Sequence, residues 1–238
     1  MKSLFYNLGK QIGPKIRKAK WAYLAATAPE AEVLQAEYAT GFDMAHQLRK
    51  QLSPCPDINQ WINEIADPLI RSLKNNLRTF SYEAVHASDP QAFCLPGGFI
   101  FISDSMVHRC DRDTDQMAFI LAHEMAHIIE GHVMERMLGN ALVKTIMHCG
   151  HLHAAAVGSL GRLGPHFFER AYSQENELRA DTFAVRLIKA AGYDPAGAID
   201  LFLHLEPLQT EPLLGKYFST HPSCKVRIKN IKEMIKDI

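Results

Sequence analysis

The chain has 238 residues, a formal net charge of zero, 47% hydrophobic residues and 22% charged residues. This balance is typical of a globular protein with a real core and gives no basis for predicting nucleic-acid binding. The five cysteines are widely spaced and form no C-x-x-C pair, which argues against a disulfide framework and a cysteine-type zinc knuckle. We therefore expect a reducing compartment, with the cytoplasm as the location.

The start of the chain is basic. Residues 1–29 contain no acidic residue, and their lysines and arginines are Lys2, Lys10, Lys15, Arg17, Lys18 and Lys20. We predict neither a secretory signal nor a transmembrane helix, because no apolar run is long and continuous enough. Apolar residues at a helical period allow a membrane-surface helix, a targeting segment or a helix packed on the domain. Peripheral membrane contact and organelle targeting therefore stay as alternatives to a cytoplasmic location.

Helices are expected in the first third of the chain. Residues 14–52 are predicted to be helical, most strongly from Glu30 to Leu52, where Ala, Leu, Glu and Gln are frequent. A turn follows at residues 53–56, which include two prolines. Asp57 is predicted to be the N-cap of the next helix, which continues through about Asn76 with apolar residues at helical spacing.

The hydrophobic pattern changes at Thr79. Phe80, Tyr82 and Val85 predict one strand and residues 99–102 another, with a turn at residues 96–98 between them. After these strands the chain is predicted to be almost all helix, over residues 112–138, 166–191, 195–205 and 223–236. Helices, a small sheet and then helices again indicate an α+β fold.

The strongest chemical signal is the segment His123-Glu124-Met125-Ala126-His127. Residues four apart lie on one face of a helix, so His123 and His127 can bind the same ion. Glu124 is offset by about 100° and can reach a water on that ion. Two imidazoles and a carboxylate base suit a catalytic zinc, and the apolar flanks argue against a chance match in a surface helix. We therefore predict a zinc ion bound at this segment.

A catalytic zinc needs a third protein ligand. Gly131 and His132 follow His127 at the wrong spacing for the metzincin pattern, and the inverted H-x-x-E-H order is absent. The remaining option is a glutamate from a later helix. Glu177 and Asp181 share a helix face, so Glu177 can bind zinc while Asp181 accepts a hydrogen bond from a ligand histidine. The alternative is that Glu177 belongs to an exposed charged face.

The segments HEMAH at 123–127 and ENELRAD at 175–181 resemble the gluzincin peptidases of the HtpX and CAAX prenyl endopeptidase family, peptidase family forty-eight. That family includes soluble bacterial members and a mitochondrial inner-membrane quality-control protease. Residues 91–102 look like its strand segment with Pro-Gly-Gly, although Gln91 stands where the family usually has Asn. Residues 220–222 with Arg227-Ile228 look like its late motif. The absence of clear membrane helices favours the soluble branch.

The resemblance implies a fold and a domain organisation. We expect a mostly helical zincin-type metallopeptidase domain over residues 79–238, with a small sheet beside the active-site helix. Residues 1–78 would be a helical extension packed on this catalytic domain.

The resemblance also implies a role for each site residue. The zinc ligands would be His123, His127 and Glu177, with one zinc per chain. Glu124 would be the base and later the proton donor, and Asp181 would orient His123. His221 would donate a hydrogen bond to the oxyanion of the tetrahedral intermediate. Together these roles describe an endopeptidase that acts in protein quality control.

A substrate-binding strand is implied as well. The family's strand after Pro-Gly-Gly lies along the cleft, so residues 98–102 would pair with a peptide or protein in extended conformation. The two glycines agree with this role, since they let another backbone approach closely. The expected substrate-binding residues are Gly97, Gly98, Phe99 and Ile100.

Other interpretations stay open. His148, His151 and His153 form a cluster that could be a second metal site, but we favour a polar face because no carboxylate or cysteine has matching spacing. The chain could also be a zinc-stabilised binding or chaperone-like module of the same fold, although a structural zinc does not need Glu124. A metal-free interaction domain would leave the agreement between residues 123–127 and Glu177 unexplained.

Overall fold

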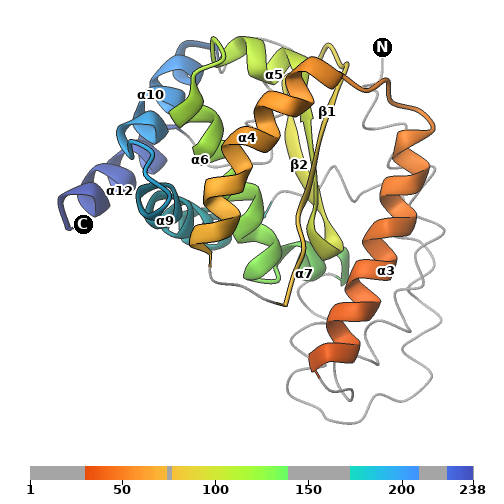
Figure 1. Ribbon diagram of the computed structural model, residues 1–238. Helices are drawn as coiled ribbons and strands as arrows, with labels where there is room; N and C mark the ends of the chain where they lie inside the picture. The colour runs from red at the N-terminus through yellow and green to blue at the C-terminus, as the bar shows by residue number, and fades with distance from the viewer. Residues whose placement is uncertain (1–29, 74–76, 139–171, 209–223, 238) are drawn as a thin grey trace.

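The computed structural model describes residues 30–73, 77–138, 172–208 and 224–237, to which the structural statements below refer. Helices pack around a small sheet (Figure 1), so the expected α+β class is confirmed. The elements in chain order are α3 (Glu30–Arg49), α4 (Pro56–Ser72), β1 (Ser81–Val85), β2 (Ala92–Leu95), the 3-10 turn η2 (Pro96–Gly98), β3 (Phe99–Ser103), α5 (Asp104–Arg109), α6 (Thr114–Ile129), α7 (His132–Leu138), α9 (Gln174–Ala190), α10 (Ala196–Leu205), the 3-10 turn η5 (Glu206–Leu208) and α12 (Cys224–Asp237).

The sheet has three strands in the order β1-β3-β2. The central strand β3 is parallel to β1 and antiparallel to β2, and Phe99 is opposite both Ser81 and Leu95. Every residue of β3 is buried. Helices pack on the sheet, because α4 contacts β1 and α6 contacts both β2 and β3. A strand buried on both faces has a continuous apolar run in place of alternation, as residues 99–102 show.

Two short elements, β2 and α5, are not predicted by the sequence. All four residues of β2 are buried. Its sequence therefore lacks the alternation of apolar and polar residues that is typical of a strand with one solvent-exposed face. α5 begins directly after β3 and is capped by Ser103, whose hydroxyl accepts a hydrogen bond from Met106 N at 3.1 Å. An element of one or two turns contains too few periods to be distinguished from a loop.

The helix α4 begins earlier than expected. Its N-cap is Cys55, whose side chain makes no capping hydrogen bond, and Pro56 opens the helix. The prediction of Asp57 as the N-cap is therefore wrong. Proline suits the first helical position, since the N–H that it lacks would have no partner there. The apolar face of α4, from Ile58 to Leu69, is buried in the same core as α6. The domain boundary after residue 78 stays a prediction, and this core runs across it.

The helix α6 is the central helix of the core. Every residue from Gln116 to Ile128 is buried. Asp113 caps its start by accepting a hydrogen bond from Gln116 N at 2.9 Å. The expected single helix over residues 112–138 is interrupted between α6 and α7, where Gly131 has a φ of 74°. Glycine adopts this left-handed conformation without steric cost, which explains the break.

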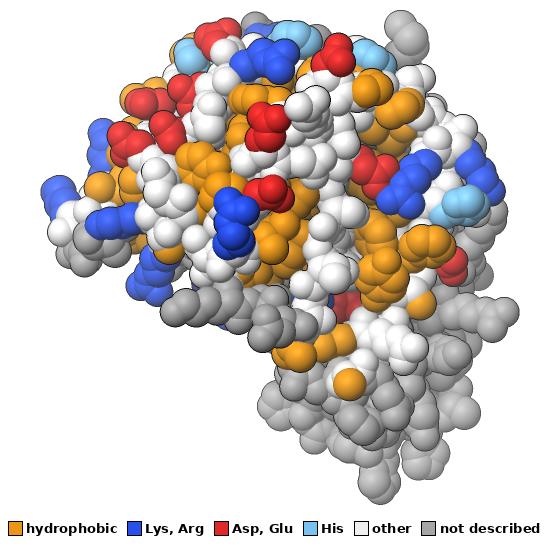
Figure 2. All heavy atoms as spheres, viewed as in Figure 1, with side chains coloured by type: hydrophobic (Ala, Val, Ile, Leu, Met, Phe, Trp, Pro, Cys, Tyr) orange, Lys and Arg blue, Asp and Glu red, His pale blue; other side chains and the backbone are white. Residues whose placement is uncertain are grey.

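Charged side chains of both signs are spread over the face shown in Figure 2, in keeping with the net charge of zero. Within the described ranges no helix combines the length and the apolar composition needed to cross a bilayer. The basic residues before Glu30 and the cluster of His148, His151 and His153 lie outside these ranges. The interpretations of both segments therefore stay predictions.

Candidate metal centre

Three side chains on two packed helices form a compact cluster. His123 and His127 come from α6, and Glu177 comes from α9, the helix that packs against it (Figure 1). The Nε2 atoms of His123 and His127 are 3.1 Å apart. The carboxylate oxygens of Glu177 lie 3.5 Å from His123 Nε2 and 3.4 Å from His127 Nε2. The structure thus brings together the three residues that the sequence predicts as ligands.

The donor set of this cluster fits a metal ion. Each of the three residues offers one ligand atom, and these atoms lie within 4.8 Å of one another. None of the three side chains is more than 4% exposed. Two imidazole nitrogens and one carboxylate oxygen, with a further position for water, are the ligands of many catalytic zinc sites.

The spacing on α9 places both predicted carboxylates on one buried face. Ser173 caps the helix by accepting a hydrogen bond from Asn176 N at 3.1 Å. Glu177 and Asp181 follow one turn apart, each with 0% exposure. Asp181 Oδ1 lies 3.0 Å from His123 Nδ1. Because Nε2 of His123 faces the cluster, a proton on Nδ1 can be donated to Asp181, which is the orienting contact that the sequence leads us to expect.

Arg227 of α12 contacts both Asp181 and His123, although the sequence interpretation assigns it no role at the site. Its side chain is 1% exposed, and Nε and one terminal nitrogen donate to the two oxygens of Asp181 at 2.8 and 2.5 Å. The same terminal nitrogen lies 3.2 Å from His123 Nδ1, and the other lies 3.6 Å from Glu177 Oε2. The guanidinium carbon is 4.3 Å from the ring centre of Phe202. Arg227 therefore joins α12 to both helices of the cluster, α6 and α9.

The cluster has more buried carboxylates than buried guanidinium groups. Its buried carboxylates are Glu124, Glu177 and Asp181, and Arg227 is its buried guanidinium. Uncompensated charge is costly to bury, so a further positive charge is a favourable partner for these carboxylates. Either a proton on the imidazoles or a bound cation can supply that charge.

The two ligand histidines respond differently to their surroundings. Burial and Arg227 lower the pKa of His123, but Asp181 and Glu177 outweigh them and raise it to about 9. At His127 burial dominates and holds the pKa well below its usual value. His123 therefore carries a proton near neutral pH in the metal-free protein, and an ion that binds its Nε2 must displace that proton.

Glu124 lies beside His123 on α6 and is 5% exposed. Cys94 is its neighbour from β2: burial and the negative charge of Glu124 raise the pKa of that thiol well above its usual value. The sulfur of Cys94 is 3.8 Å from the hydroxyl of Tyr172. A thiol with a raised pKa is a poor nucleophile, so the carboxylate of Glu124 is the candidate acid–base group of the cluster.

His127 has partners of its own that the sequence interpretation missed. Its Nδ1 lies 3.1 Å from Nδ1 of His132. The ring of Tyr172 stacks on its imidazole, with centroids 3.7 Å apart and planes 13° apart. The guanidinium carbon of Arg136 lies 4.2 Å from the centre of the Tyr172 ring. In the sequence, the signal for this contact is His132 itself, five residues after His127. This spacing matches no ligand pattern, because His132 contacts the ligand His127 and does not bind the ion.

The Pro-Gly-Gly turn is packed against the chain itself. A Cβ on Gly97 would lie 2.4 Å from Cα of Tyr38, and a Cβ on Gly98 would lie 1.9 Å from the carbonyl oxygen of Thr79. Both glycines have positive φ, 77° and 104°. The backbone that approaches them closely therefore belongs to α3 and to the segment before β1. It is not left open for a substrate.

The sheet also bears on the expected substrate strand. Phe99 and Ile100 belong to β3, whose backbone pairs with β1 on one edge and with β2 on the other. A strand that is bonded on both edges cannot add a substrate strand. The pairing of β3 on both edges therefore argues against β-addition of a substrate along residues 99–102, and substrate binding by Gly97, Gly98, Phe99 and Ile100 stays a prediction. The strand at the edge of the sheet that packs on α6 is β2.

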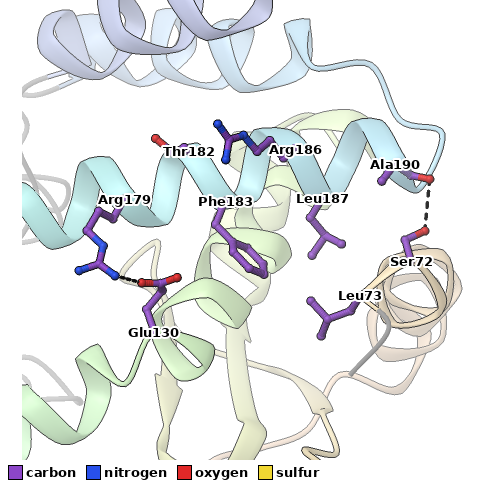
Figure 3. A pocket seen from close by; sticks show the side chains of 9 residues that line it. All are labelled: Ser72, Leu73, Glu130, Arg179, Thr182, Phe183, Arg186, Leu187 and Ala190. Atoms are coloured by element: carbon purple, nitrogen blue, oxygen red, sulfur yellow. Dashed lines mark hydrogen bonds and ion pairs between the residues drawn. The ribbon is translucent and has the colours of Figure 1, made fainter. Parts of the chain in front are cut away.

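A separate hollow lies on the other side of α9. Figure 3 shows Leu73, Phe183 and Leu187 directed into it between α4 and α9, while Arg179 pairs with Glu130 at one end. Its volume is about 470 Å³, and its lining includes none of the three predicted ligands. One face of α9 therefore carries the metal cluster and the opposite face borders an apolar groove.

Comparison with known proteins supports these observations. A model of peptidase family M48 matches residues 56–235. The mitochondrial metalloendopeptidase OMA1 of Arabidopsis thaliana is 29% identical over 178 residues, which cover 72% of this chain and 36% of the relative. The protein of the same name from Schizosaccharomyces pombe is 32% identical over 154 residues, which cover 61% of this chain and 44% of the relative. The metalloprotease LoiP of Escherichia coli is 28% identical over 173 residues, which cover 69% of this chain and 67% of the relative.

The chain thus spans less than half the length of these two OMA1 relatives. Their names contradict the expected cytoplasmic location, because relatives from plants, fungi and animals are called mitochondrial. The family match includes α4 and both metal-bearing helices, and it confirms the resemblance seen in the sequence motifs. The chain therefore belongs to peptidase family M48.

Proposed function

We propose that this chain is a zinc-dependent endopeptidase that hydrolyses peptide bonds of extended protein substrates. The observation that carries the proposal is the convergence of His123 Nε2, His127 Nε2 and the Glu177 carboxylate in a buried cluster, with Glu124 beside it. The family and the names of the relatives, metalloendopeptidase and metalloprotease, support a peptidase. Protein quality control is the cellular setting that we propose with it.

Glu124 is the acid–base group in this proposal. His123, His127 and Glu177 would hold the zinc, which would supply a Lewis acid and make a water molecule more acidic, with a pKa of about 7. Glu124, one residue from His123 on α6, accepts a proton from the attacking water and later delivers it to the leaving amine. Its burial limits competing contacts with solvent, which suits a carboxylate that exchanges protons with the substrate.

Two sets of residues position the ligand histidines. Asp181 accepts a hydrogen bond from Nδ1 of His123 and so keeps its Nε2 directed at the cluster, while Arg227 fixes Asp181 through two hydrogen bonds. His132 meets Nδ1 of His127 in a corresponding way. Such outer contacts fix the tautomer and the ring orientation of a ligand.

The oxyanion donor that we propose is His221, which lies outside the described residues. The resemblance in the late motif supports it. Arg227, six residues further along and part of the same late motif, donates hydrogen bonds to Asp181 at the cluster.

An extended substrate would pair with β2 in place of β3. β2 is at the edge of the sheet, packs on α6, and carries Cys94 next to Glu124. A peptide along this edge would pass close to the acid–base group. Main-chain pairing at a sheet edge is a common way to bind extended peptides without strict sequence preference.

The experiment that tests the proposal separates metal binding from catalysis. Glu124→Gln should retain the zinc bound by His123, His127 and Glu177 and lower cleavage of an unfolded protein by about 100- to 10,000-fold, because it removes the proton acceptor and no ligand. Glu130→Gln is the matched control: it makes the same chemical change at the end of α6 and should leave both properties unchanged.

The outcomes distinguish an enzyme from a zinc-stabilised module. Full activity of Glu124→Gln would remove this residue from the mechanism. A wild-type protein that binds zinc but cleaves no unfolded substrate would favour a non-catalytic member of the fold. Absence of zinc from the wild-type protein would contradict the metal site itself.

A further inference from the structure

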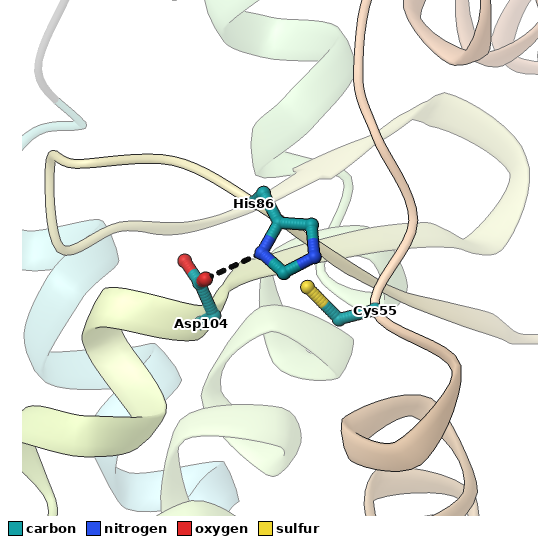
Figure 4. A group of neighbouring side chains, drawn as sticks. All are labelled: Cys55, His86 and Asp104. Carbon is teal, nitrogen blue, oxygen red and sulfur yellow. Dashed lines mark hydrogen bonds and ion pairs between the residues drawn. The ribbon is translucent and has the colours of Figure 1, made fainter.

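A second group of metal-binding residue types lies at the carboxyl ends of β1 and β3. Cys55 immediately precedes α4, His86 follows β1, and Asp104 opens α5 (Figure 4). One ligand atom from each residue lies within 4.8 Å of the others. None of these residues belongs to the cluster on α6 and α9, so the proposed peptidase mechanism gives the group no role.

Backbone hydrogen bonds hold Cys55 and His86 next to each other. Cys55 N donates to the carbonyl oxygen of Ala84, and His86 N donates to that of Ser53, each at 2.9 Å. The segment before α4 is therefore tied to the end of β1 on both sides of the group. The two side chains are placed by the fold before any ion binds, which lowers the entropic cost of binding.

Asp104 sets the orientation of His86. Its Oδ1 accepts hydrogen bonds from Ala87 N at 3.0 Å and Ser105 N at 2.8 Å, and its Oδ2 lies 2.7 Å from His86 Nδ1. Burial raises the pKa of Asp104, but these hydrogen bonds outweigh burial and lower it. An ionised carboxylate accepts the proton of Nδ1, so Nε2 keeps a lone pair for a metal. Metal-binding histidines commonly have a carboxylate in this position.

Cys55 does not fit a catalytic nucleophile. Figure 4 shows its sulfur beside the imidazole of His86, with Asp104 on the other side of the ring. Burial and the charge of Asp104 raise the pKa of the Cys55 thiol, whereas a nucleophilic cysteine needs a lowered pKa. A soft divalent cation can still replace the thiol proton, because thiolate and imidazole are preferred ligands of such ions.

The group is open to solvent on one side. The side chain of His86 is 59% exposed and that of Asp104 is 21% exposed. Both line a hollow of about 440 Å³ together with His108, which lies four residues after Asp104 on the same face of α5. Cys55 is only 4% exposed and does not line this hollow, but its sulfur lies beside the imidazole of His86 (Figure 4). An ion that enters from solvent would therefore meet His86 first and reach the sulfur through the contact between these two side chains.

We propose that Cys55 Sγ and His86 Nε2 bind a second zinc-class divalent cation, that Asp104 orients His86, and that water or His108 completes the coordination. Binding forms a bond between sulfur and metal and releases the thiol proton to solvent. The ion would join the segment before α4, the end of β1 and the start of α5. Its role is to stabilise this corner of the fold.

Cobalt binding to the full chain tests this proposal. A cobalt–thiolate bond gives an intense charge-transfer band in the near ultraviolet, which imidazole and carboxylate ligands do not give. The metal-free protein should bind about two cobalt ions per chain, one of which produces the band. Glu177→Gln should lose the cobalt ion at the cluster of His123 and His127, which gives no thiolate band. It should keep the cobalt ion at Cys55, which gives the band.

Variants of the group complete the test. Cys55→Ser should lose the band and one ion while retaining zinc-dependent peptidase activity. His86→Gln changes an exposed side chain and should weaken the same ion without disturbing the core. Cys110→Ser is the control, because Cys110 is a buried thiol outside the group and its replacement should keep the band.

Two results would overturn the second site. One is a single cobalt per wild-type chain with no thiolate band. The other is a band that survives in both Cys55→Ser and His86→Gln, since another thiol would then be the ligand. Either result leaves the peptidase proposal untouched, because that proposal depends on the ion bound by Glu177.

Discussion

A histidine whose Nδ1 faces an aspartate oxygen occurs in two opposite surroundings in this protein. His123 and Asp181 are 3.0 Å apart, with at most 4% of either side chain exposed. His86 and Asp104 are 2.7 Å apart, and most of the His86 side chain is exposed. The buried pair is enclosed by α6, α9 and α12 and includes Arg227 as a third member. The carboxylate of the exposed pair is instead held by two backbone N–H groups.

The comparison shows how surroundings decide the cost of the same contact. Charges removed from water need a full set of partners, because their lost hydration must be replaced. Asp181 accordingly has Arg227 in addition to His123. Asp104 keeps part of its hydration and needs only backbone donors. We therefore expect the buried pair to be vulnerable to any single change and the exposed pair to tolerate one.

The largest effect is expected from Arg227→Met, which would leave Asp181 buried without its bidentate donor. Breaking a buried ion pair costs about 3–5 kcal/mol, so the free energy of unfolding of the metal-free protein should fall by that amount in urea denaturation. Arg186→Met removes an exposed guanidinium from α9 and should change it by less than about 0.5 kcal/mol. Similar changes in the free energy of unfolding for both variants would contradict this expectation, since burial of the arginine would then make no difference.

Asp181→Ala should have the next largest effect, on metal affinity. The change removes the acceptor that orients His123, and loss of such a contact weakens metal binding by about 10–100-fold. Competition with a chelator measures this. Glu177→Ala, which removes a ligand, serves as the reference and should abolish metal binding at the cluster of His123 and His127. An unchanged zinc affinity in Asp181→Ala would show that Arg227 alone can hold His123 in place.

The partners of the two ligand histidines differ in charge. Nδ1 of His127 faces the imidazole of His132, whereas Nδ1 of His123 faces the carboxylate of Asp181. His132→Phe keeps a ring but removes the hydrogen-bonding nitrogen, and we expect metal affinity to fall by about 10-fold, the low end for such contacts. His132→Gln restores an acceptor and should recover part of the loss in the same chelator competition. If His132→Phe binds zinc normally, the stacked ring of Tyr172 suffices to orient His127.

Much of the buried site follows from the sequence because its residues repeat along helices. His123 and His127 are four apart, as are Glu177 and Asp181, and this spacing by itself predicts that each pair shares a helix face. The residues that surround them do not follow in this way. Arg227, His132 and Tyr172 each reach the cluster from another segment, and no spacing rule connects segments whose packing is unknown.

The exposed group could not be predicted for a related reason. Cys55, His86 and Asp104 come from three different connections. His86 and Asp104 meet because β1 and β3 are parallel neighbours, and Cys55 joins them because the segment before α4 is hydrogen-bonded to the end of β1. The long helices are predicted well, since each contains several periods of apolar residues. The glycines at 97 and 98 predict that another backbone approaches closely, but glycine does not indicate which one, and in the structure Tyr38 and Thr79 of the chain itself are the close neighbours.

The smallest effect belongs to the exposed pair. Asp104→Asn should lower the free energy of unfolding by only about 0.2–1 kcal/mol, the usual range for an exposed pair. Hydrogen bonds from Ala87 N, His86 and Ser105 N lower the pKa of Asp104 below its ordinary value of 3.8. A lowered folded pKa means that the stabilisation is fully present above the unfolded value and is lost as the pH falls through the folded value. The difference between wild type and variant, measured by urea denaturation with a chelator present, should thus be constant above about pH 5 and decrease below about pH 4. A difference above about 2 kcal/mol, or one that grows in acid, would show that the exposed pair behaves like the buried one.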